Sequence, residues 1–352
     1  MREIQINSIR GPRLIGENHV PYIIAEAGIN HNGDISIAKK LIYEACKAGA
    51  DAIKFQKRTV EEMFTHEHLN KPYNKDYAFG KTYGEHKKAL EFTDDQYMEL
   101  FEYAKSLKID FLCSGFDFTS FRFIERELDV PVHKIASPFV THYPLLKEVA
   151  GYGKPMLLST GMHDIDEIER SVNYIRQFND QLIVLQATTL YPCPDEEVNL
   201  RVLDTFRQRL HTLVGYSSHD KGVVLPAVSV ALGACVIEKH FTLDRMMKGP
   251  DHVASVEPRG LELIVKYCHT VEQGLGSYEK KINESERAQR SKYGVSVVSR
   301  CELAPGDILS PENITVKCPG GGISPIHYDD IMGHKVLKNI PRDTIIYGDD
   351  IE

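Results

Sequence analysis

The chain has 352 residues, of which 42% are hydrophobic and 26% are charged. This length predicts one large domain of about 250 residues with something smaller beside it, and the composition is that of a globular protein with a sizeable core. Because 50 Asp and Glu residues outnumber 42 Lys and Arg residues, the net charge is −8. That charge argues against a general binder of nucleic acid or of anionic membranes, although a local lysine cluster could still hold a small anionic substrate. We expect neither a membrane-spanning helix nor a signal peptide, because no long apolar run occurs.

Eight short apolar runs alternate with longer stretches of helical period. The runs cover residues 22–27, 52–55, 111–113, 132–135, 156–158, 182–185, 213–215 and 235–237. The stretches between them, such as residues 35–49 and 164–178, often follow Asp or Thr and end at Gly, as capped helices do. Apolar strands that alternate with helices indicate a parallel sheet buried on both faces. Eight such units predict an α/β protein with a (β/α)8 TIM barrel. A Rossmann-like open sheet is the alternative, which the absence of a GxGxxG motif after the first strand weakens.

Two parts of the chain fall outside this alternation. Residues 57–92 are rich in Lys, His and Tyr, and the next helix is expected only near Asp94. A loop of this length predicts a lid or binding loop on the catalytic face, with a disordered insertion as the alternative. After the barrel domain (residues 1–276), the charged composition of residues 277–293 predicts a linker with a helical turn or two. The short β-like pieces of residues 294–352 predict a small, mostly-β domain. Its core would be thin, so we expect this domain to pack against another surface.

Polar side chains stand at or just beyond the end of nearly every predicted strand. They are Glu26, Lys54, Gln56, Ser114, Lys134, Ser137, Ser159, Tyr191, Ser217, His219 and His240, with Asp251 on the loop after the last strand. In a TIM barrel the chemistry takes place at the carboxyl ends of the strands. Polar groups inside apolar strands are costly unless they are paired or used. The pattern therefore predicts a single active site at this rim.

The residue types at the rim have a definite chemical character. The two lysines and the serines can hold a phosphate or a carboxylate. His219 and His240 lie on adjacent predicted strands and could share one divalent metal ion, with water and substrate completing its shell. Glu26 could donate or accept a proton, or serve only as a counter-ion to Lys54. Asp251 could hydrogen-bond sugar hydroxyls, or be an ordinary turn residue. No HExxH or GxSxG motif occurs, which argues against zincin proteases and serine hydrolases.

Several of these residues lie in motifs that follow one another along the chain. The motifs are residues 24–33 (IAEAGINHNG), 54–56 (KFQ), 134–137 (KIAS), 158–162 (LSTGM), 191–192 (YP), 215–219 (GYSSH), 238–242 (EKHFT) and 249–251 (GPD). In these motifs, and over nearly its whole length, the sequence resembles the sialic acid synthase (N-acetylneuraminate synthase) family. The tail resembles that family's antifreeze-like SAF domain, with residues 319–323 (PGGGI) near its centre.

The resemblance implies a transferase that condenses phosphoenolpyruvate with the open-chain form of an N-acetylated amino sugar. The sugar would be N-acetylmannosamine or a 2,4-diacetamido-trideoxyhexose, and the products a nine-carbon 2-keto-3-deoxy acid and phosphate. By resemblance, Lys54, Ser114, Lys134, Ser137, Ser159 and Ser217 would hold phosphoenolpyruvate, Gln56, Tyr191 and Asp251 would contact the sugar, and Glu26 would handle protons. His219 and His240 would bind Mn²⁺ or Mg²⁺. The family is typically a homodimer in which each SAF domain caps the partner's barrel.

Two departures from the family pattern concern the sugar. Bacterial members typically carry Lys-Arg-Pro-Gly in the SAF domain, whereas Cys318 stands here in place of the arginine. Pro138 and Phe139 follow the fourth strand where the family usually has Gly-Glu or a similar pair. The resemblance therefore implies the reaction type and leaves the sugar open among N-acetylmannosamine, its 6-phosphate, and a legionaminic or pseudaminic acid precursor.

Two alternative functions remain open on the sequence. One is a phosphoenolpyruvate-dependent synthase that acts on a phosphorylated sugar, of the sialic acid 9-phosphate or 3-deoxy-octulosonate type. The other is a non-catalytic carbohydrate-binding protein, which would have no use for the rim lysines or for a metal ion. The seven cysteines are widely spaced and form no CxxC motif. We therefore expect no disulfide framework, and a reducing cytoplasm as the compartment.

Overall fold

In the computed structural model, which describes residues 3–352, eight parallel strands form one sheet. The strands are β3 (Tyr22–Gly28), β4 (Ala52–Lys57), β5 (Asp110–Gly115), β6 (His133–Ile135), β7 (Met156–Ser159), β8 (Leu182–Gln186), β9 (Leu213–Ser218) and β10 (Ala234–His240). Their order is β5-β4-β3-β10-β9-β8-β7-β6, and the two end strands, β5 and β6, also contact each other. The sheet is thus a nearly closed barrel, which confirms the predicted TIM barrel fold.

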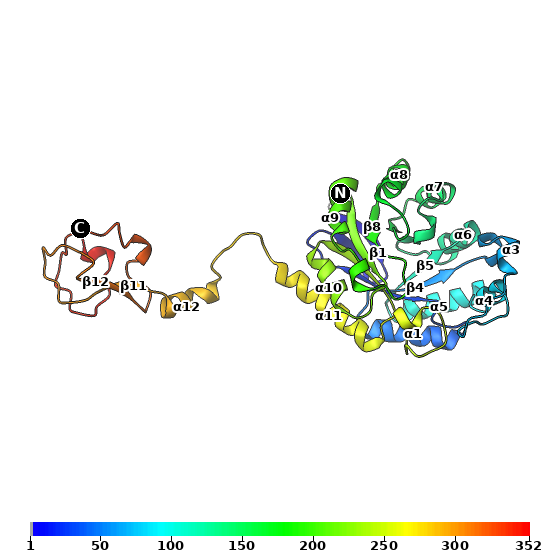
Figure 1. The fold of residues 1–352 in the computed structure, drawn as a ribbon, viewed down its shortest axis with the longest axis horizontal. Coiled ribbons are helices and arrows are strands. Elements are labelled where there is room, and N and C mark those ends of the chain that lie inside the picture. The colour runs from blue at the N-terminus through cyan, green and yellow to red at the C-terminus, as the bar shows by residue number, and fades with distance from the viewer. Residues whose placement is uncertain (1–2) are drawn as a thin grey trace. The chain divides into compact units, whose positions relative to one another are not determined.

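Helices surround the strands of this barrel (Figure 1). They are α1 (Ile35–Lys47), α5 (Asp94–Ser106), α6 (Phe118–Glu127), α7 (Tyr143–Gly151), α8 (Ile165–Ile175), α9 (Val202–Leu210), α10 (Val224–Ala231) and α11 (Pro258–Leu275). Short 3₁₀ turns lie at Ser137–Phe139, Asp195–Glu197 and His252–Ala254. The side chains of Asp34, Thr93 and Asp164 cap the first turns of α1, α5 and α8. Such caps satisfy backbone amides that have no partner within the helix, so each fixes where a helix begins.

An antiparallel hairpin precedes the barrel and was not predicted. It consists of β1 (Glu3–Ser8) and β2 (Gly11–Gly16). Its buried side chains, Ile4, Ile6 and Ile15, join the same hydrophobic core as the barrel. Along β1 the exposed and buried positions alternate, which is the pattern of a strand with one face in water.

The long segment after β4 is ordered, which overturns the alternative of a disordered insertion. It holds three short helices before α5, namely α2 (Val60–Met63), α3 (His66–Leu69) and α4 (Tyr83–Lys88). Aromatic contacts tie it together: the ring of Tyr83 meets that of Phe64 edge-on at 5.1 Å, and the rings of Tyr73 and His86 stack at 4.6 Å. A capping box between Thr82 and Glu85 starts α4.

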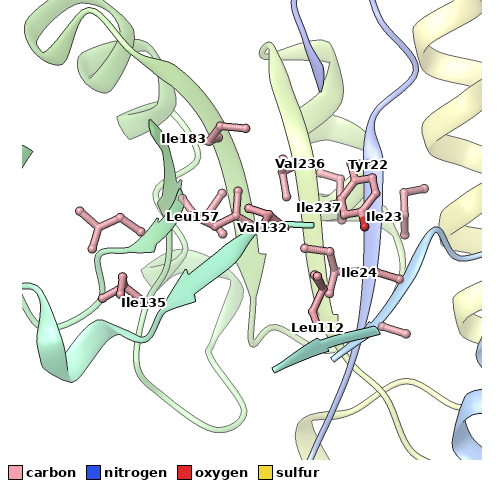
Figure 2. Close-up of a cluster of buried hydrophobic side chains, with 14 of the residues drawn as sticks. Tyr22, Ile23, Ile24, Leu112, Val132, Ile135, Leu157, Ile183, Val236 and Ile237 are labelled. Atoms are coloured by element: carbon pink, nitrogen blue, oxygen red, sulfur yellow. The ribbon is translucent and has the colours of Figure 1, made fainter. Parts of the chain in front are cut away.

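An apolar layer lies beneath the polar strand ends. Ile24, Leu112 and Leu157 are fully buried, and Figure 2 shows them gathered with side chains of neighbouring strands. Each stands two positions before a predicted site residue on the same strand, so it faces the same side of the sheet. Burying one such side chain stabilises the fold by about 1.5–3 kcal/mol. This layer supports the charged rim above it.

Contacts divide the chain into two units, Met1–Gly276 and Ser277–Glu352. The second unit contains α12 (Glu284–Tyr293), a full helix where a turn or two was expected, and none of its side chains is buried. The antiparallel strands β11 (Ser296–Ser299) and β12 (Ile314–Lys317) follow, with 3₁₀ turns at Pro325–His327 and Gly348–Asp350. A separate small core holds Val297, Leu303, Leu309, Ile314, Ile331, Val336, Ile340 and Ile346. Among the described residues, no helix is long and apolar enough to cross a membrane.

Candidate active site

A cavity of about 340 Å³ opens at the carboxyl ends of the barrel strands, and every predicted site residue lines it. Those residues are Glu26, Lys54, Gln56, Ser114, Lys134, Ser137, Ser159, Tyr191, Ser217, His219, His240 and Asp251. They come from different strands and loops, so only the closed sheet brings them together. The geometry therefore assembles one site from the scattered polar residues of the sequence.

The strand register sets the neighbours within the site. Glu26 of β3 stands opposite Lys54 of β4 on one side and opposite His240 of β10 on the other. Gln56 is opposite Ser114 of β5. Because side chains alternate between the faces of a strand, Lys54 and Gln56 both face the cavity.

A cluster of charged groups forms the floor of the cavity. The Lys54 ammonium lies 2.6 Å from Glu26 Oε2 and 3.7 Å from Glu238 Oε2, and it donates a hydrogen bond to Ser114 Oγ at 3.0 Å. Glu238 is shared, since its Oε1 lies 3.7 Å from Lys134 Nζ. All of these charged side chains are almost completely buried. Two lysines and two carboxylates therefore neutralise one another before any substrate binds.

The charges in this cluster shift its pKa values unequally. Burial alone would lower the pKa of Lys54, but the carboxylates of Glu238 and Glu26 outweigh it and raise that pKa. Burial and the nearby Lys54 charge lower the pKa of Lys134 to about 8, against the opposing effect of Glu238. For Glu238 the effect of burial is overcome by Lys134 and Lys54, which hold its pKa down at about 2. Lys54 and Glu238 are thus ionised at neutral pH, and of the two floor lysines Lys134 is the one nearer to losing its proton.

Small hydroxyls complete the inner end of the site. Ser217 Oγ donates to Glu238 Oε1 at 3.0 Å, and Ser137 Oγ accepts from the Gly161 amide at 3.0 Å. Ser159 Oγ is buried and has no hydrogen-bond partner within residues 3–352. A buried hydroxyl without a partner is unusual, and a bound anion would satisfy it.

His219 and His240 face each other with ring centres 5.3 Å apart. His219 Nδ1 lies 2.6 Å from the Thr188 carbonyl oxygen, to which it donates, so Nε2 is the nitrogen left with a free lone pair. Burial and the neighbouring His240 lower the pKa of His219 to about 3, so this imidazole is neutral at pH 7. His240 Nδ1 is buried without a hydrogen-bond partner in the described chain.

These two imidazoles fit a divalent metal ion. Neutral imidazole nitrogen is a common ligand, and a carbonyl that orients the other ring nitrogen is a usual second partner. Within residues 3–352 no three His, Cys, Asp or Glu side chains gather in a metal-binding arrangement. The protein would therefore supply two ligands, and water and substrate the others.

A buried ion pair fixes the strands that carry these histidines. Lys239, next to His240, lies 3.5 Å from the Asp220 carboxylate and donates to Ser218 Oγ at 2.7 Å. Asp220 follows His219 directly and also accepts from the Tyr216 hydroxyl at 2.6 Å. The pair thus ties the end of β9 to β10 outside the cavity and sets the spacing of the two rings.

The outer part of the cavity carries the residues predicted to contact the sugar. Gln56 Nε2 donates to Glu26 Oε1 at 2.7 Å, and Gln56 Oε1 accepts from Arg58 at 2.5 Å. The Tyr191 ring lies 4.2 Å from the ring of His219. Asp251 Oδ2 lies 3.9 Å from His240 Nδ1. These three residues thus line the cavity, Tyr191 and Asp251 against the histidines and Gln56 between Glu26 and Arg58.

Sequence reasoning missed some residues of the site. Glu238, two residues before His240 on the last strand, was considered only as a possible structural ion-pair partner of Lys54 and was not predicted as a site residue. The segment after β4 was expected to form a lid or binding loop on the catalytic face, but apart from Arg58, noted only as lying near a strand end, the residues that reach the cavity were not identified. They are Arg58, Met63, Phe64, Tyr73, Tyr83, His86 and Lys87. The available signal was the richness of residues 57–92 in Lys, His and Tyr, which does not single out the residues that reach the cavity.

Cys318 lies in the second unit. Its thiol is exposed, and it lines a separate cavity of about 420 Å³ with Lys317, Asp343 and Tyr347 among others. Lys317 forms an ion pair with Asp343 at the edge of that cavity. This is the position at which the resemblance led us to expect an arginine.

Comparison with known proteins decides the family. The chain matches the NeuB family over residues 41–280 and the SAF domain over residues 294–352. It belongs to the NeuB family. The predicted resemblance to sialic acid synthases with a SAF domain is thereby confirmed.

The relatives of this NeuB-family chain make related acids. It is 40% identical over 336 residues to the human N-acetylneuraminate-9-phosphate synthase, covering 95% of this chain and 93% of the relative. It is 36% identical over 354 residues to the N,N'-diacetyllegionaminic acid synthase of Legionella pneumophila, covering 99% and 98%. A solved sialic acid synthetase of Leptospira borgpetersenii, in complex with citrate, is 32% identical with a TM-score of 0.72, covering 82% of this chain and 95% of that one. The chain therefore belongs with enzymes of the sialic acid synthase type.

Proposed function

We propose that this protein condenses phosphoenolpyruvate with the open-chain aldehyde of an N-acylated amino sugar. The products are a nine-carbon 2-keto-3-deoxy acid and inorganic phosphate. The observation that carries this proposal is the pair of buried lysines with a ring of serines beneath two facing histidines. It provides an anion-binding end and a metal-binding end within one cavity.

The inner end suits phosphoenolpyruvate. Lys54 and Lys134 supply positive charge, and the hydroxyls of Ser114, Ser137, Ser159 and Ser217 supply directional donors for the phosphate and carboxylate oxygens. Water is excluded from much of this surface because the side chains are buried, which strengthens each charged contact. A carbohydrate-binding protein would have no need of such a charged floor.

The reaction balances as an aldol-like addition followed by loss of phosphate. The C3 methylene carbon of phosphoenolpyruvate forms a bond to the aldehyde carbon, whose oxygen takes a proton. Water adds to C2, the C2–O bond to phosphate breaks, and the C2 hydroxyl gives its proton to the departing phosphate as the keto group forms. Glu26, paired with Lys54, relays the proton that the water loses to the oxygen that was the aldehyde. Lys54 and Lys134 offset the negative charge at each stage.

The histidines determine where the aldehyde lies. His219 and His240 would hold Mn²⁺ or Mg²⁺, which when bound polarises the aldehyde carbonyl. Tyr191 and Asp251 stand beside them, and with Gln56 in the same cavity they would orient the sugar hydroxyls and its acylamino group. We place the reaction in the cytoplasm, which the free state of all seven cysteines supports.

A release assay tests this function. Phosphate released from phosphoenolpyruvate in the presence of Mn²⁺ would be measured with N-acetylmannosamine, its 6-phosphate, 2,4-diacetamido-2,4,6-trideoxyhexoses and arabinose 5-phosphate. We expect release that depends on one of the N-acylated sugars. Release with arabinose 5-phosphate alone would replace the proposal by an eight-carbon synthase. No release by folded, metal-loaded protein would contradict it.

Lys134 gives this function a predicted pH dependence. The protonated ammonium binds the substrate anion, and its pKa is lowered to about 8 by burial and by Lys54. Anion binding is therefore complete below that pH and is lost as the pH rises through it. We expect kcat/KM for phosphoenolpyruvate to fall about tenfold per pH unit on the alkaline side. In the Lys134→Arg variant, whose side chain stays protonated, kcat/KM should not show this decrease at alkaline pH. A wild-type profile that is flat to high pH, or an unchanged decrease in the variant, would argue against the role of Lys134.

We further propose a homodimer in which the SAF domain of one protomer caps the barrel of the other. The separate core of the second unit and the exposed surface of α12 support this arrangement. A chain that ends at Gly276 keeps the barrel core and the two histidines. We expect it to bind Mn²⁺ as the full chain does but to lose most synthase activity. Equilibrium Mn²⁺ binding and phosphate release check this, and full activity in the shortened chain would contradict the capping role.

A further inference from the structure

The cavity contains a second group of cations, apart from the floor. Arg58 and Lys87 line its outer part, where the segment after β4 covers the barrel. The charges that act most strongly on Lys87 are those of Arg58, Asp251 and Glu91. Those that act on Lys134 are Glu238, Lys54 and Glu26. The two groups of charges are thus distinct regions of one cavity.

Arg58 is already paired. Its guanidinium contacts Glu91 Oε1 at 2.7 Å, its backbone amide donates to the other oxygen of that carboxylate at 3.1 Å, and its second amino group donates to Gln56. These contacts use two of the five N–H donors of the guanidinium, and its buried Nε has no hydrogen-bond partner within residues 3–352. Arg58 therefore contributes charge to the outer region, and only part of its hydrogen-bonding capacity is used.

Lys87 differs from the other lining cations. Lys54, Lys134 and Arg58 each have a carboxylate oxygen within 4.0 Å. From Glu3 to Glu352, no carboxylate oxygen lies that close to Lys87 Nζ, and its ammonium donates no hydrogen bond. The ammonium is half-buried, 5.3 Å from the centre of the Tyr83 ring, and open to the cavity.

The environment of this ammonium favours an anionic ligand. Burial and the charge of Arg58 lower the pKa of Lys87 to about 8. Burial and a neighbouring positive charge both disfavour the protonated form of a lysine. An anion bound between Lys87 and Arg58 would stabilise the charged forms of both side chains. Phosphoenolpyruvate does not meet this need, because the inner lysines and serines receive it.

We propose that Lys87 recognises a phosphate ester on the sugar substrate, at a carbon remote from the aldehyde. This inference rests on the proposed function, because it assumes that the sugar occupies the outer part of the cavity. Lys87 would donate to the phosphate oxygens, and Arg58 would add its charge from behind. Lys87 is thus a specificity-determining residue that separates a phosphorylated sugar from its free form.

The test compares two sugars and four proteins. Wild type, Lys87→Met, Lys87→Arg and Lys88→Met would be assayed with N-acetylmannosamine 6-phosphate and with N-acetylmannosamine. Lys88 is the matched control, because it neighbours Lys87 on α4 but is exposed and pairs with Glu61 outside the cavity. Lys87→Met should fold normally, since Lys87 makes no ion pair. Its melting temperature checks this.

We expect wild type to prefer the phosphorylated sugar. Lys87→Met should lower kcat/KM for that sugar about 10- to 100-fold, mainly through KM, which is the loss of one hydrogen bond between charged groups. Its kcat/KM for the free sugar and its KM for phosphoenolpyruvate should stay within about twofold of wild type. Lys87→Arg should retain most of the preference, and Lys88→Met all of it.

The outcomes distinguish failure of this inference from failure of the proposed synthase function on which it rests. Turnover of the free sugar as fast as the phosphorylated one by wild type would overturn the inference and leave the synthase intact. Equal losses on both sugars in Lys87→Met would overturn it as well, and so would an equal effect in Lys88→Met. If wild type turned over neither sugar nor the diacetamido sugars, the proposed function would fail, and the inference with it.

Discussion

The Lys54→Met variant is expected to lose kcat/KM for phosphate release on the order of 1,000-fold. Lys54 contacts Glu26, Glu238 and Ser114 in the buried floor of the cavity. Removing one member of a buried ion pair costs about 3–5 kcal/mol of folding stability. Loss of one donor that stabilises developing negative charge costs about 100- to 1,000-fold in kcat. Two carboxylates would then face the incoming anion with only Lys134 to offset them. Steady-state phosphate release, with the melting temperature measured alongside, checks this expectation.

Lys57→Met is the matched control for that variant. Lys57 lies on the same strand but on the opposite face, where it pairs with Asp94 at 2.6 Å and lies over the rings of Tyr97 and Phe123. We expect it to lower the melting temperature while leaving kcat/KM within about twofold. A Lys54→Met enzyme with more than about a tenth of wild-type kcat/KM would contradict the assigned role, because loss of a donor that stabilises developing charge lowers kcat about 100-fold or more.

Removal of either histidine is expected to abolish metal dependence together with turnover. The protein supplies two imidazoles, so His219→Ala or His240→Ala removes half of its ligands. Mutation of a residue that only hydrogen-bonds a metal ligand typically lowers metal affinity about 10- to 100-fold. Loss of a ligand itself should therefore lower the affinity at least about 100-fold. Binding of Mn²⁺, measured by electron paramagnetic resonance without substrate, reports this directly and does not depend on activity.

His19→Ala serves as the control for these variants. His19 is a partly exposed histidine that contacts Glu3 at 2.8 Å in the region of the N-terminal hairpin. It should bind Mn²⁺ as wild type does. If His219→Ala or His240→Ala kept wild-type Mn²⁺ affinity, or kept a rate stimulated by metal, the ligand assignment would be wrong.

The barrel and most of its rim could be predicted from the sequence because both depend on local patterns. A parallel strand buried on both faces reads as a short apolar run, and Lys54 or Lys134 stands out within it. The fold rule that places chemistry at the carboxyl ends then brings these residues together without knowledge of their contacts. The register that pairs Glu26 with Lys54 is a consequence of closing the sheet.

The segment after β4 could not be predicted in the same way. Its helices are too short to show a helical period, and they are held by contacts such as the stacking of Tyr73 on His86. The N-terminal hairpin was overlooked for a related reason, because Ile4 and Ile6 alternate with polar residues over one short strand. Glu238 was visible, but its position between two lysines became evident only in three dimensions.

The measurement that tests the proposed synthase most directly uses phosphoenolpyruvate labelled with ¹⁸O in the oxygen that bridges C2 and phosphorus. The labelled substrate would be incubated with the full chain, Mn²⁺ and the sugar that supports release. Cleavage of the C–O bond predicts that the released phosphate carries the label and that a nine-carbon keto acid forms in equal amount. Unlabelled phosphate, with the label found in pyruvate or in the keto acid, would show P–O cleavage and contradict the proposed reaction.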